Sequence, residues 1–265
     1  MQLNIFQVDA FTQTLMAGNS AAVIPLTQWL SDALMQKIAN ENNLSETAFY
    51  IPTANGQFHI RWFTPEVEVD LCGHATLAAA HIIMNELHPE RDHIIFESQS
   101  GPLKVIRNGD RLTLDFPSRM PTTYNLEGLA DALGIEPSWV FKARDVVVVL
   151  DNERSVHDLN PDLGKLKALN EFAFIVTAQS SQPDVDFVSR FFAPSVGVDE
   201  DPVTGSAHCS LTPYWAKVLN KNRMTAIQVS KRQGHLVCEL NDDRVFLSGQ
   251  SVTYLRGQIE VNLEA

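Results

Sequence analysis

Cysteine is scarce in this chain, and its spacing predicts no structural role. The three cysteines, Cys72, Cys209 and Cys238, lie far apart and form no C-x-x-C pair. The sequence therefore predicts neither a disulfide scaffold nor a cysteine-based metal or redox centre. Reduced thiols in the cytoplasm are the simplest expectation.

Positive charge is also scarce. Lysine and arginine number 20 against 32 aspartates and glutamates, which gives a formal net charge of -12. A chain with acidic residues along its whole length offers no basic surface for a phosphate backbone, so nucleic acid is excluded as a partner. No run approaches the roughly 20 apolar residues that cross a bilayer, and no signal-like segment opens the chain. We expect no membrane partner.

Motifs for nucleotides and metals are missing as well. The chain has no G-x-G-x-x-G and no G-x-x-x-x-G-K-[ST] sequence, so nothing indicates a nucleotide. His74, His81 and His88 recur every seven positions, but seven helical residues rise about 10.5 Å, too far to share one ion. We therefore expect neither a cofactor nor a metal.

An internal repeat is present. Three short patterns recur in the same order, at offsets of 125, 129 and 132 residues: Glu46-Thr47-Ala48-Phe49 with Glu171-Phe172-Ala173-Phe174, Arg61-Trp62-Phe63-Thr64-Pro65 with Arg190-Phe191-Phe192-Ala193-Pro194, and Gly73-His74-Ala75 with Gly205-Ser206-Ala207. A chain of 265 residues is also near the size at which one core divides into two. We predict a duplicated domain, with one copy in 1–117 and the other in 118–250, and 251–265 packing back on the first.

The expected elements favour an α+β class. Apolar residues recur at helical spacing over Trp29–Ala39, whereas His74–Leu87 is apolar nearly all round, which is typical of a buried helix. Predicted strands and helices do not alternate strictly, so two similar α+β domains are favoured over a doubly wound sheet. Each is expected to wrap a mixed sheet around its central helix.

The starts of the two repeated helices are the candidate functional positions. Gly73 and Gly205 open them, and a helix start offers unpaired N–H groups and the positive end of a dipole. Two such ends facing one cleft would bind a small carboxylate or phosphate. The loop from Asp199 to Ser206 adds carboxylates there, which indicates a proton-handling group; alternatively, these acids simply begin a helix.

Several motifs resemble the PhzF-like (phenazine biosynthesis-like) family, related in fold to diaminopimelate epimerase and proline racemase. The resemblance covers essentially the whole chain and rests on five motifs in order: Val8-Asp9-Ala10-Phe11 with Ala17-Gly18-Asn19, Asn43-Leu44-Ser45-Glu46-Thr47, Phe63-Thr64-Pro65, Gly73-His74-Ala75-Thr76, and Asp201-Pro202-Val203-Thr204-Gly205-Ser206-Ala207. It implies two diaminopimelate epimerase-like domains with an active site in the cleft between them, and it is compatible with a homodimer.

The resemblance also implies an activity and its residues. Members of such a family move a proton within a small carboxylate-bearing metabolite without a cofactor. The family's acid/base glutamate corresponds to Glu46, and His74 and Asp201 would share the catalytic pocket. The resemblance also implies that four residues bind the substrate, namely Asn19, Gly73, Gly205 and Ser206. The sequence thus predicts an isomerase with a small-molecule partner.

Cys72 departs from the pattern. Many relatives carry a small apolar residue before the G-H pair, whereas in the epimerase relatives a cysteine at this place is a catalytic base. An amino-acid epimerase that pairs Cys72 with a carboxylate is therefore one alternative, and a catalytically silent small-acid-binding protein is another. A two-thiol racemase is excluded, because the matching place in the second half falls near Pro202. Cys72 could also be a small buried thiol that packs beside the helix.

Overall fold

The computed structural model describes residues 1–262, which fall into two compact units. Unit 1 consists of Met1–Asp115 and the segment from Ser248 onward, and unit 2 consists of Phe116–Leu247. Within residues 1–262, no helix is long and apolar enough to cross a membrane.

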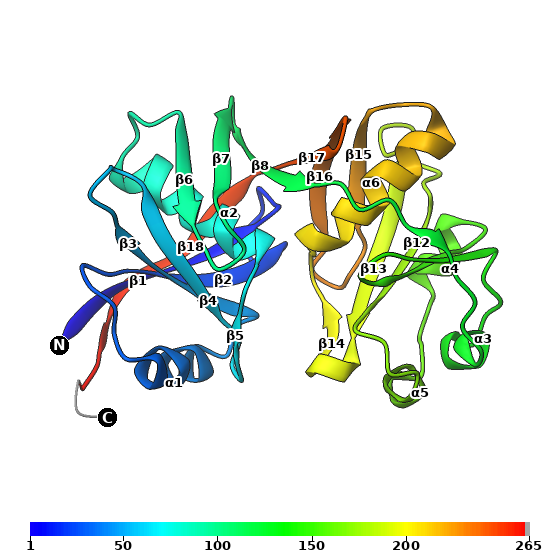
Figure 1. The fold of residues 1–265 in the computed structure, drawn as a ribbon, viewed down its shortest axis with the longest axis horizontal. Coiled ribbons are helices and arrows are strands. Elements are labelled where there is room, and N and C mark those ends of the chain that lie inside the picture. Colours follow the sequence, from blue (N-terminus) through cyan, green and yellow to red (C-terminus); the bar gives the residue numbers. More distant parts are fainter. Residues whose placement is uncertain (263–265) are drawn as a thin grey trace. The chain divides into compact units, whose positions relative to one another are not determined.

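Unit 1 is built mainly of strands (Figure 1). Its elements are β1 (Gln2–Ala10), β2 (Asn19–Pro25), α1 (Asp32–Asn42), β3 (Glu46–Pro52), β4 (Phe58–Phe63), β5 (Glu68–Val69), α2 (Gly73–His81), the π-helical continuation η1 (Ile82–Leu87), β6 (His93–Glu97), β7 (Leu103–Asn108), β8 (Arg111–Pro117) and β18 (Ser251–Glu260).

The sheet of unit 1 is mixed. β2 and β3 are parallel, as are β4 and β6, whereas β1–β2, β3–β4, β4–β5 and the β6–β7–β8 series are antiparallel. β18 returns from the far end of the chain to run antiparallel to β1, from Gln2 opposite Glu260 to Ala10 opposite Ser251. Figure 1 shows this red strand along the blue one.

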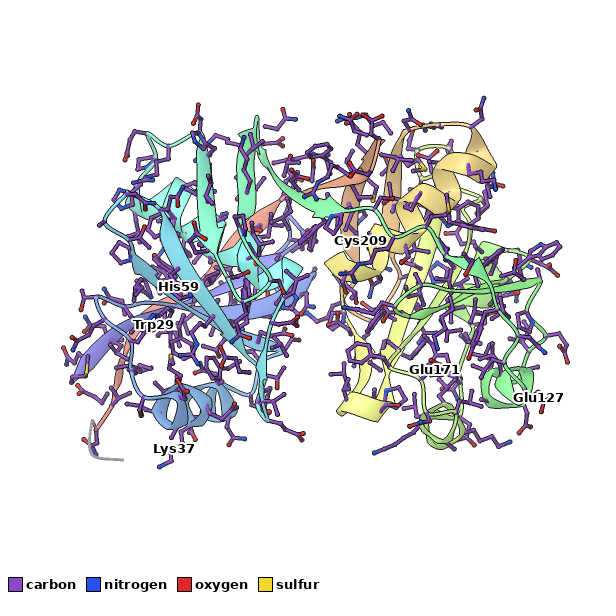
Figure 2. The ribbon with its side chains drawn as sticks, viewed as in Figure 1. Trp29, Lys37, His59, Glu127, Glu171 and Cys209 are labelled. Carbon is purple, nitrogen blue, oxygen red and sulfur yellow. The ribbon has the colours of Figure 1, made fainter. Side chains whose placement is uncertain are left out.

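Helix α1 begins later than its apolar pattern predicts. The pattern starts at Trp29, but the Ser31 side chain accepts a hydrogen bond from the Leu34 backbone N–H, so the helix starts at Asp32. Trp29 instead meets His59 of β4 edge-on, with 5.2 Å between ring centres (Figure 2). At the other end, Asn43 takes the left-handed conformation at φ 48° and stops the helix.

Helix α2 is buried on every side, as its sequence predicts. Apart from Gly73 and the half-buried His81, all its residues are buried. It packs against β1, β2, β3 and β18, so the strands surround it. The polar side chains of its first turn are therefore held close to the ends of neighbouring strands.

Unit 2 repeats this order of elements. It contains β9 (Thr122–Thr123), α3 (Leu129–Leu133), β10 (Trp139–Lys142), β11 (Val146–Val149), α4 (Glu153–His157), α5 (Leu163–Ala168), β12 (Phe174–Gln179), β13 (Phe187–Ala193), the 3-10 turn η2 (Pro194–Val196), β14 (Val198–Asp201), α6 (Gly205–Leu219), β15 (Arg223–Gln228), β16 (Gly234–Asn241) and β17 (Arg244–Gly249).

Strand pairing confirms that the two units are similar. β11 and β12 are parallel like β2 and β3, and β13 and β15 are parallel like β4 and β6. β12–β13 and β13–β14 are antiparallel, as are their counterparts β3–β4 and β4–β5. The short β9 pairs with β10 in the place that β18 takes beside β1. Each half therefore follows one plan.

An arginine–glutamate pair recurs with the repeat. In unit 1, Arg61 of β4 donates two hydrogen bonds of 2.7 Å to Glu68 of β5. In unit 2, Arg190 of β13 donates two of 2.7 and 3.0 Å to Glu200 of β14. Such two-pronged bonds fix the orientation of both side chains. They hold each short strand, and thus the loop before each central helix.

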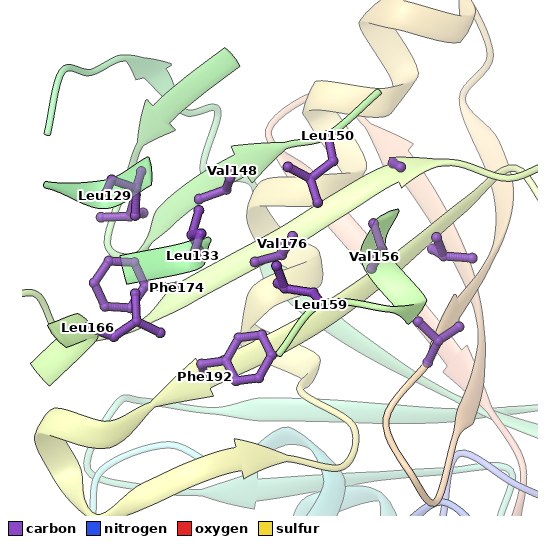
Figure 3. Packing of buried hydrophobic residues seen from close by; sticks show 14 of the residues in the cluster. Leu129, Leu133, Val148, Leu150, Val156, Leu159, Leu166, Phe174, Val176 and Phe192 are labelled. Atoms are coloured by element: carbon purple, nitrogen blue, oxygen red, sulfur yellow. The ribbon is translucent and has the colours of Figure 1, made fainter. Parts of the chain in front are cut away.

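The core of unit 2 is aliphatic and aromatic (Figure 3). Strands β11, β12 and β13 contribute Val148, Val176 and Phe192, which pack against leucines of the short helices such as Leu133 and Leu166. In unit 1, α1 lies over an equivalent cluster that includes Met35, Phe49 and Phe63. Each unit thus has a hydrophobic core of its own, as expected for a domain.

Helix α6 runs on through Pro213. A proline has no N–H to donate to the carbonyl four residues earlier, which here belongs to Cys209. The backbone N–H of Arg119 donates to that carbonyl at 2.9 Å. The segment before β9 therefore replaces the hydrogen bond that the proline removes.

We predict that Glu153 makes the stability of unit 2 acid-sensitive. Burial disfavours its charge, but hydrogen bonds from Ser181, Gln182 and Ser180 outweigh that and lower the pKa of Glu153 to about 2. Because the folded pKa lies below the unfolded one, its contribution is present above pH 5 and lost as the pH falls toward 2. Glu153→Gln should cost roughly 1–3 kcal/mol at pH 7.

Urea unfolding at pH 7 and at pH 4 measures this. The gap between Glu153→Gln and the native chain should shrink at the lower pH. The exposed Glu127, labelled in Figure 2, provides the control, since Glu127→Gln should change little. An equal loss for both substitutions would contradict the assignment.

Candidate active site

Glu46 is placed by the end of α1. After Asn43 turns the chain, two residues lead into β3, whose first residue is Glu46. There β3 runs parallel to β2, with Glu46 opposite Ala21. The Asn42 amide donates to the Thr47 hydroxyl at 3.1 Å and ties the helix end to the strand. The glutamate is thus fixed at a strand end, with only 17% of its side chain exposed.

Asn19 is placed by a glycine that no other residue could replace without strain. Gly18 has φ +62°, and a Cβ built on it would lie 2.2 Å from the Ala10 carbonyl oxygen. The chain turns there to begin β2 at Asn19. The asparagine is completely buried, so its amide is held in one position at the start of the strand.

Cys72 and His74 lie at the start of α2. Cys72 is the residue just before the helix, and its carbonyl oxygen accepts a 2.5 Å hydrogen bond from the Thr76 hydroxyl. His74 lies two residues further on, and both side chains are buried. Since α2 is enclosed by strands, these two polar groups face other groups of unit 1 rather than solvent.

These elements bring four side chains together around the His74 ring. On one side, Nε2 of the ring lies 3.0 Å from Oε2 of Glu46, within ion-pair distance. On the other, Nδ1 lies 3.2 Å from the amide nitrogen of Asn19 and 3.5 Å from the sulfur of Cys72. The sequence placed all four in the candidate site, and unit 1 gathers them into one cluster.

The charges of the cluster follow from burial and from one carboxylate. Burial by itself disfavours a charged imidazole, but Cys72 and Glu46 outweigh it, and the pKa of His74 is raised well above its ordinary value. Burial, and then Glu46, raise the pKa of Cys72. At neutral pH the thiol therefore keeps its proton, and the support for a protonated His74 comes from Glu46.

The cluster can act chemically in two ways. A carboxylate held beside an imidazole in a water-poor place can exchange a proton with a bound molecule, with the ring stabilising developing negative charge. Thiol, imidazole and carboxylate are also metal ligands, and one atom of each of Glu46, Cys72 and His74 lies within 4.8 Å of the others.

Asp201 and its neighbours belong to unit 2. Asp201 ends β14, and its side chain accepts a short hydrogen bond from the Thr204 hydroxyl. The buried Gln228 accepts from the Thr204 N–H at 2.8 Å and donates to the Asp201 carbonyl at 2.7 Å. This amide fixes the loop that leads into α6.

Gly205 and Ser206 are the first two residues of α6. The Ser206 hydroxyl accepts a hydrogen bond of 3.0 Å from Arg144, whose guanidinium also binds Asp145 through two bonds of 2.8 Å. Unit 2 therefore brings Asp201, Gly205 and Ser206 together at the start of one helix. Their participation in a common site with Glu46 stays a prediction.

Glu171, which the sequence pattern aligns with Glu46, lies three residues before β12 and has a different environment. Lys142 donates to its two oxygens at 2.9 and 2.7 Å, and Tyr124 donates at 2.7 Å. Burial opposes its charge, but Lys142 and Tyr124 outweigh burial and lower the pKa of Glu171. Figure 2 labels this residue. A carboxylate with these partners is a poor base. Thr47 pairs with Phe63 in unit 1 and Phe174 pairs with Phe192 in unit 2, so the strand register places Ala173, and not Glu171, at the position of Glu46.

Sequence reasoning missed the residues that hold these groups in place. Gln228, Arg144 and Lys142 lie outside the recognised motifs. The internal repeat offered one signal for Lys142. Glu171 recurs without a histidine at the position that matches His74, so its carboxylate needs another partner. Gln228 lies 24 residues from Thr204, and Arg144 lies 62 residues from Ser206, so no local periodicity connects either pair.

Known proteins resemble this chain over nearly its full length. The family model for phenazine biosynthesis-like proteins matches residues 8–257. The chain belongs to the phenazine biosynthesis-like family. An uncharacterised isomerase of Pseudomonas aeruginosa is 48% identical over 98% of this chain and 100% of its own length. Two further relatives are also named as uncharacterised isomerases, so the PhzF-like chain belongs among isomerases.

Solved structures give the same fold. A PhzF-family protein of Enterococcus faecalis superposes with a TM-score of 0.95 at 43% identity, covering 98% of this chain and 100% of that one. A hydroxyproline epimerase of Agrobacterium vitis shares the fold alone, with a TM-score of 0.63 at 11% identity and coverages of 97% and 92%. The resemblance inferred from the motifs and the epimerase-like α+β fold class are both confirmed.

We predict that all three thiols of this PhzF-like protein resist modification until it unfolds. Burial raises the pKa of Cys209 to about 11 and that of Cys238 to about 12, and it also raises the pKa of Cys72. Since the thiolate is the reactive form, a disulfide reagent at pH 8 should label none quickly in the native protein and three after denaturation. A fast-reacting Cys72 would contradict the buried placement.

Proposed function

We propose that this PhzF-like protein is a cofactor-independent isomerase in which Glu46 moves a proton on a small carboxylate-bearing metabolite. The observation that carries the proposal is the environment of Glu46. Its carboxylate lies 3.0 Å from a buried imidazole, and only 17% of its side chain is exposed, whereas Glu171, which the sequence pattern aligns with it, pairs with Lys142. An imidazole can share a proton with a neighbouring carboxylate, which makes Glu46 the candidate for proton transfer.

The neighbours of Glu46 support this role. A single carboxylate that takes a proton from one carbon and returns it to another needs no second base, provided that water is excluded. His74, held 3.0 Å from the Glu46 carboxylate, is placed to stabilise negative charge that develops on the substrate. Asn19 and the Gly73 backbone lie beside the ring and would orient the substrate.

The residues of unit 2 complete the proposal. Gly205 and Ser206 at the start of α6 would bind the carboxylate of the substrate through N–H and hydroxyl groups. Asp201, held by Thr204 and Gln228, would position it. These roles rest on the family resemblance and on the local order of this loop.

An epimerase that uses Cys72 is the second candidate. The observation in its favour is the 3.5 Å distance between the Cys72 sulfur and Nδ1 of His74, since a thiol beside an imidazole can share a proton. The raised pKa of Cys72 argues against a resting thiolate. Cys72→Ala separates the two mechanisms, because it removes this base and leaves Glu46 in place.

We predict that Glu46→Gln abolishes proton exchange. In heavy water, the native protein should incorporate deuterium into one member of a panel of small cyclic and amino-acid-like carboxylic acids, read by NMR or mass spectrometry. The glutamine keeps the size of the side chain but cannot accept the proton, so exchange should fall by at least about 100-fold, the lower range for losing general acid–base catalysis.

Glu171→Gln is the matched control. It makes the same chemical change at a glutamate that pairs with Lys142 rather than with an imidazole, so exchange should persist while urea stability falls through the loss of that pair. Cys72→Ala should also retain exchange. If Glu46→Gln exchanges deuterium as fast as the native chain, the proposal is wrong. If Glu46→Gln binds an acid and the native chain does not exchange deuterium into that acid, the protein is a catalytically silent acid-binding protein.

A further inference from the structure

We infer that Cys72, His74 and Glu46 form a binding site for a thiophilic divalent cation of the Zn²⁺ type, and that the bound ion inhibits the enzyme. Sulfur, imidazole and carboxylate from these residues lie within 4.8 Å of one another. Among residues 1–262, no other group of three such side chains comes together.

The chemistry of the three ligands selects the ion. A thiolate favours soft or borderline cations, imidazole suits zinc, copper, iron and nickel, and Mg²⁺ and Ca²⁺ prefer oxygen alone. One sulfur, one nitrogen and one oxygen therefore favour Zn²⁺ over the hard cations. Three protein ligands leave a fourth position for water, as in open zinc sites.

The distances suit a tetrahedral ion at the sulfur and the ring. Bonds of about 2.3 Å to sulfur and about 2.1 Å to nitrogen separate the two ligand atoms by about 3.6 Å in a tetrahedron. The Cys72 sulfur and Nδ1 of His74 are 3.5 Å apart. The Asn19 amide nitrogen lies 3.2 Å from the same Nδ1, and Glu46 faces the other ring nitrogen. An ion therefore takes the place of the Asn19 contact, and the Glu46 side chain must rotate toward the sulfur side to complete the site.

Binding exchanges protons for metal bonds. As S–Zn and N–Zn bonds form, the S–H proton of Cys72 and one imidazolium proton of His74 pass to solvent, and no oxidation or reduction takes place. A disulfide reagent reacts with a thiolate that is already present, whereas Zn²⁺ displaces the thiol proton as the S–Zn bond forms. The same cysteine can therefore bind a cation while it resists modification.

The inhibitory part of the inference rests on the proposed function. A cation held by Glu46 and His74 occupies the oxygen that would take the proton and the ring that would stabilise charge. One equivalent of Zn²⁺ should therefore stop deuterium exchange, and a chelator should restore it. Mg²⁺ at the same concentration should leave exchange unchanged, because it lacks affinity for sulfur.

The experiment measures binding directly on the full chain. Protein freed of metal by a chelator is titrated with Zn²⁺ in competition with a chromophoric indicator, and with Co²⁺ to observe a thiolate-to-cobalt charge-transfer band. We expect one tightly bound ion per chain and the band in the native protein. Cys72→Ser should lose the band. Its affinity for Zn²⁺ should fall by more than roughly tenfold, which is the loss expected when a group that only contacts a metal ligand is changed.

Cys209→Ser is the matched control, because this thiol is also buried but lies in unit 2 at α6 (Figure 2). It should keep the band and the affinity. Circular dichroism checks that both variants fold, and if Cys72→Ser does not, the cobalt spectrum of the native protein decides. No competitive Zn²⁺ binding, no thiolate band, or equal binding by Cys72→Ser would each overturn the site.

Failure of the site and failure of the proposed function are distinguishable. Exchange that depends on Glu46 without Zn²⁺ binding overturns the cation site and leaves the isomerase. Zn²⁺ binding that depends on Cys72 without exchange of any acid in the panel overturns the proton-transfer function and leaves the site. Binding together with undiminished exchange overturns only the inhibition.

Discussion

The burial of helix α2 is the constraint on which the candidate site depends. The helix has no polar face, so it must be enclosed, and strands β1, β2, β3 and β18 pack against it. Its polar side chains are confined to its ends. Enclosing the helix therefore forces His74 against whatever begins the neighbouring strands, which is Asn19 in β2 and Glu46 in β3. The energy of packing an apolar helix thus places a polar cluster where water is scarce.

Duplication gives the protein two copies of one plan, and local chemistry distinguishes them. The arginine–glutamate pairs, Arg61 with Glu68 and Arg190 with Glu200, are kept in both units because they hold a short strand before the central helix. The glutamate that begins β3 has no counterpart in unit 2, where the strand register places Ala173 at the matching position. The supporting ion pair is repeated, whereas the candidate reactive carboxylate is found once.

The buried cluster is chemically ambiguous by its nature. A carboxylate near an imidazole is suited to proton transfer, and a thiol added to the same pair makes it a ligand set for a soft cation. Cys72 is the residue that adds the second property, and its place at the start of α2 leaves it 3.5 Å from the ring. Proton transfer and cation binding therefore compete for the same glutamate and histidine wherever a cysteine lies next to them.

The family, the duplicated plan and the identity of the candidate residues can all be inferred from the amino-acid sequence. Short motifs such as Asn43 to Thr47 encode local events, namely a left-handed helix stop followed by a strand, and the apolar run after Gly73 encodes a buried helix. These depend on neighbouring residues, so they are readable in one dimension.

Only the tertiary structure decided the environment of each group. Glu46 lies 3.0 Å from the ring of His74, which is 28 positions away, and Glu171 is neutralised by Lys142, which is 29 positions away. Both contacts depend on which strands pair and in what register. Whether a carboxylate is free to act is a property of its neighbours in space. Because long-range packing chooses those neighbours, no local pattern in the chain reveals them.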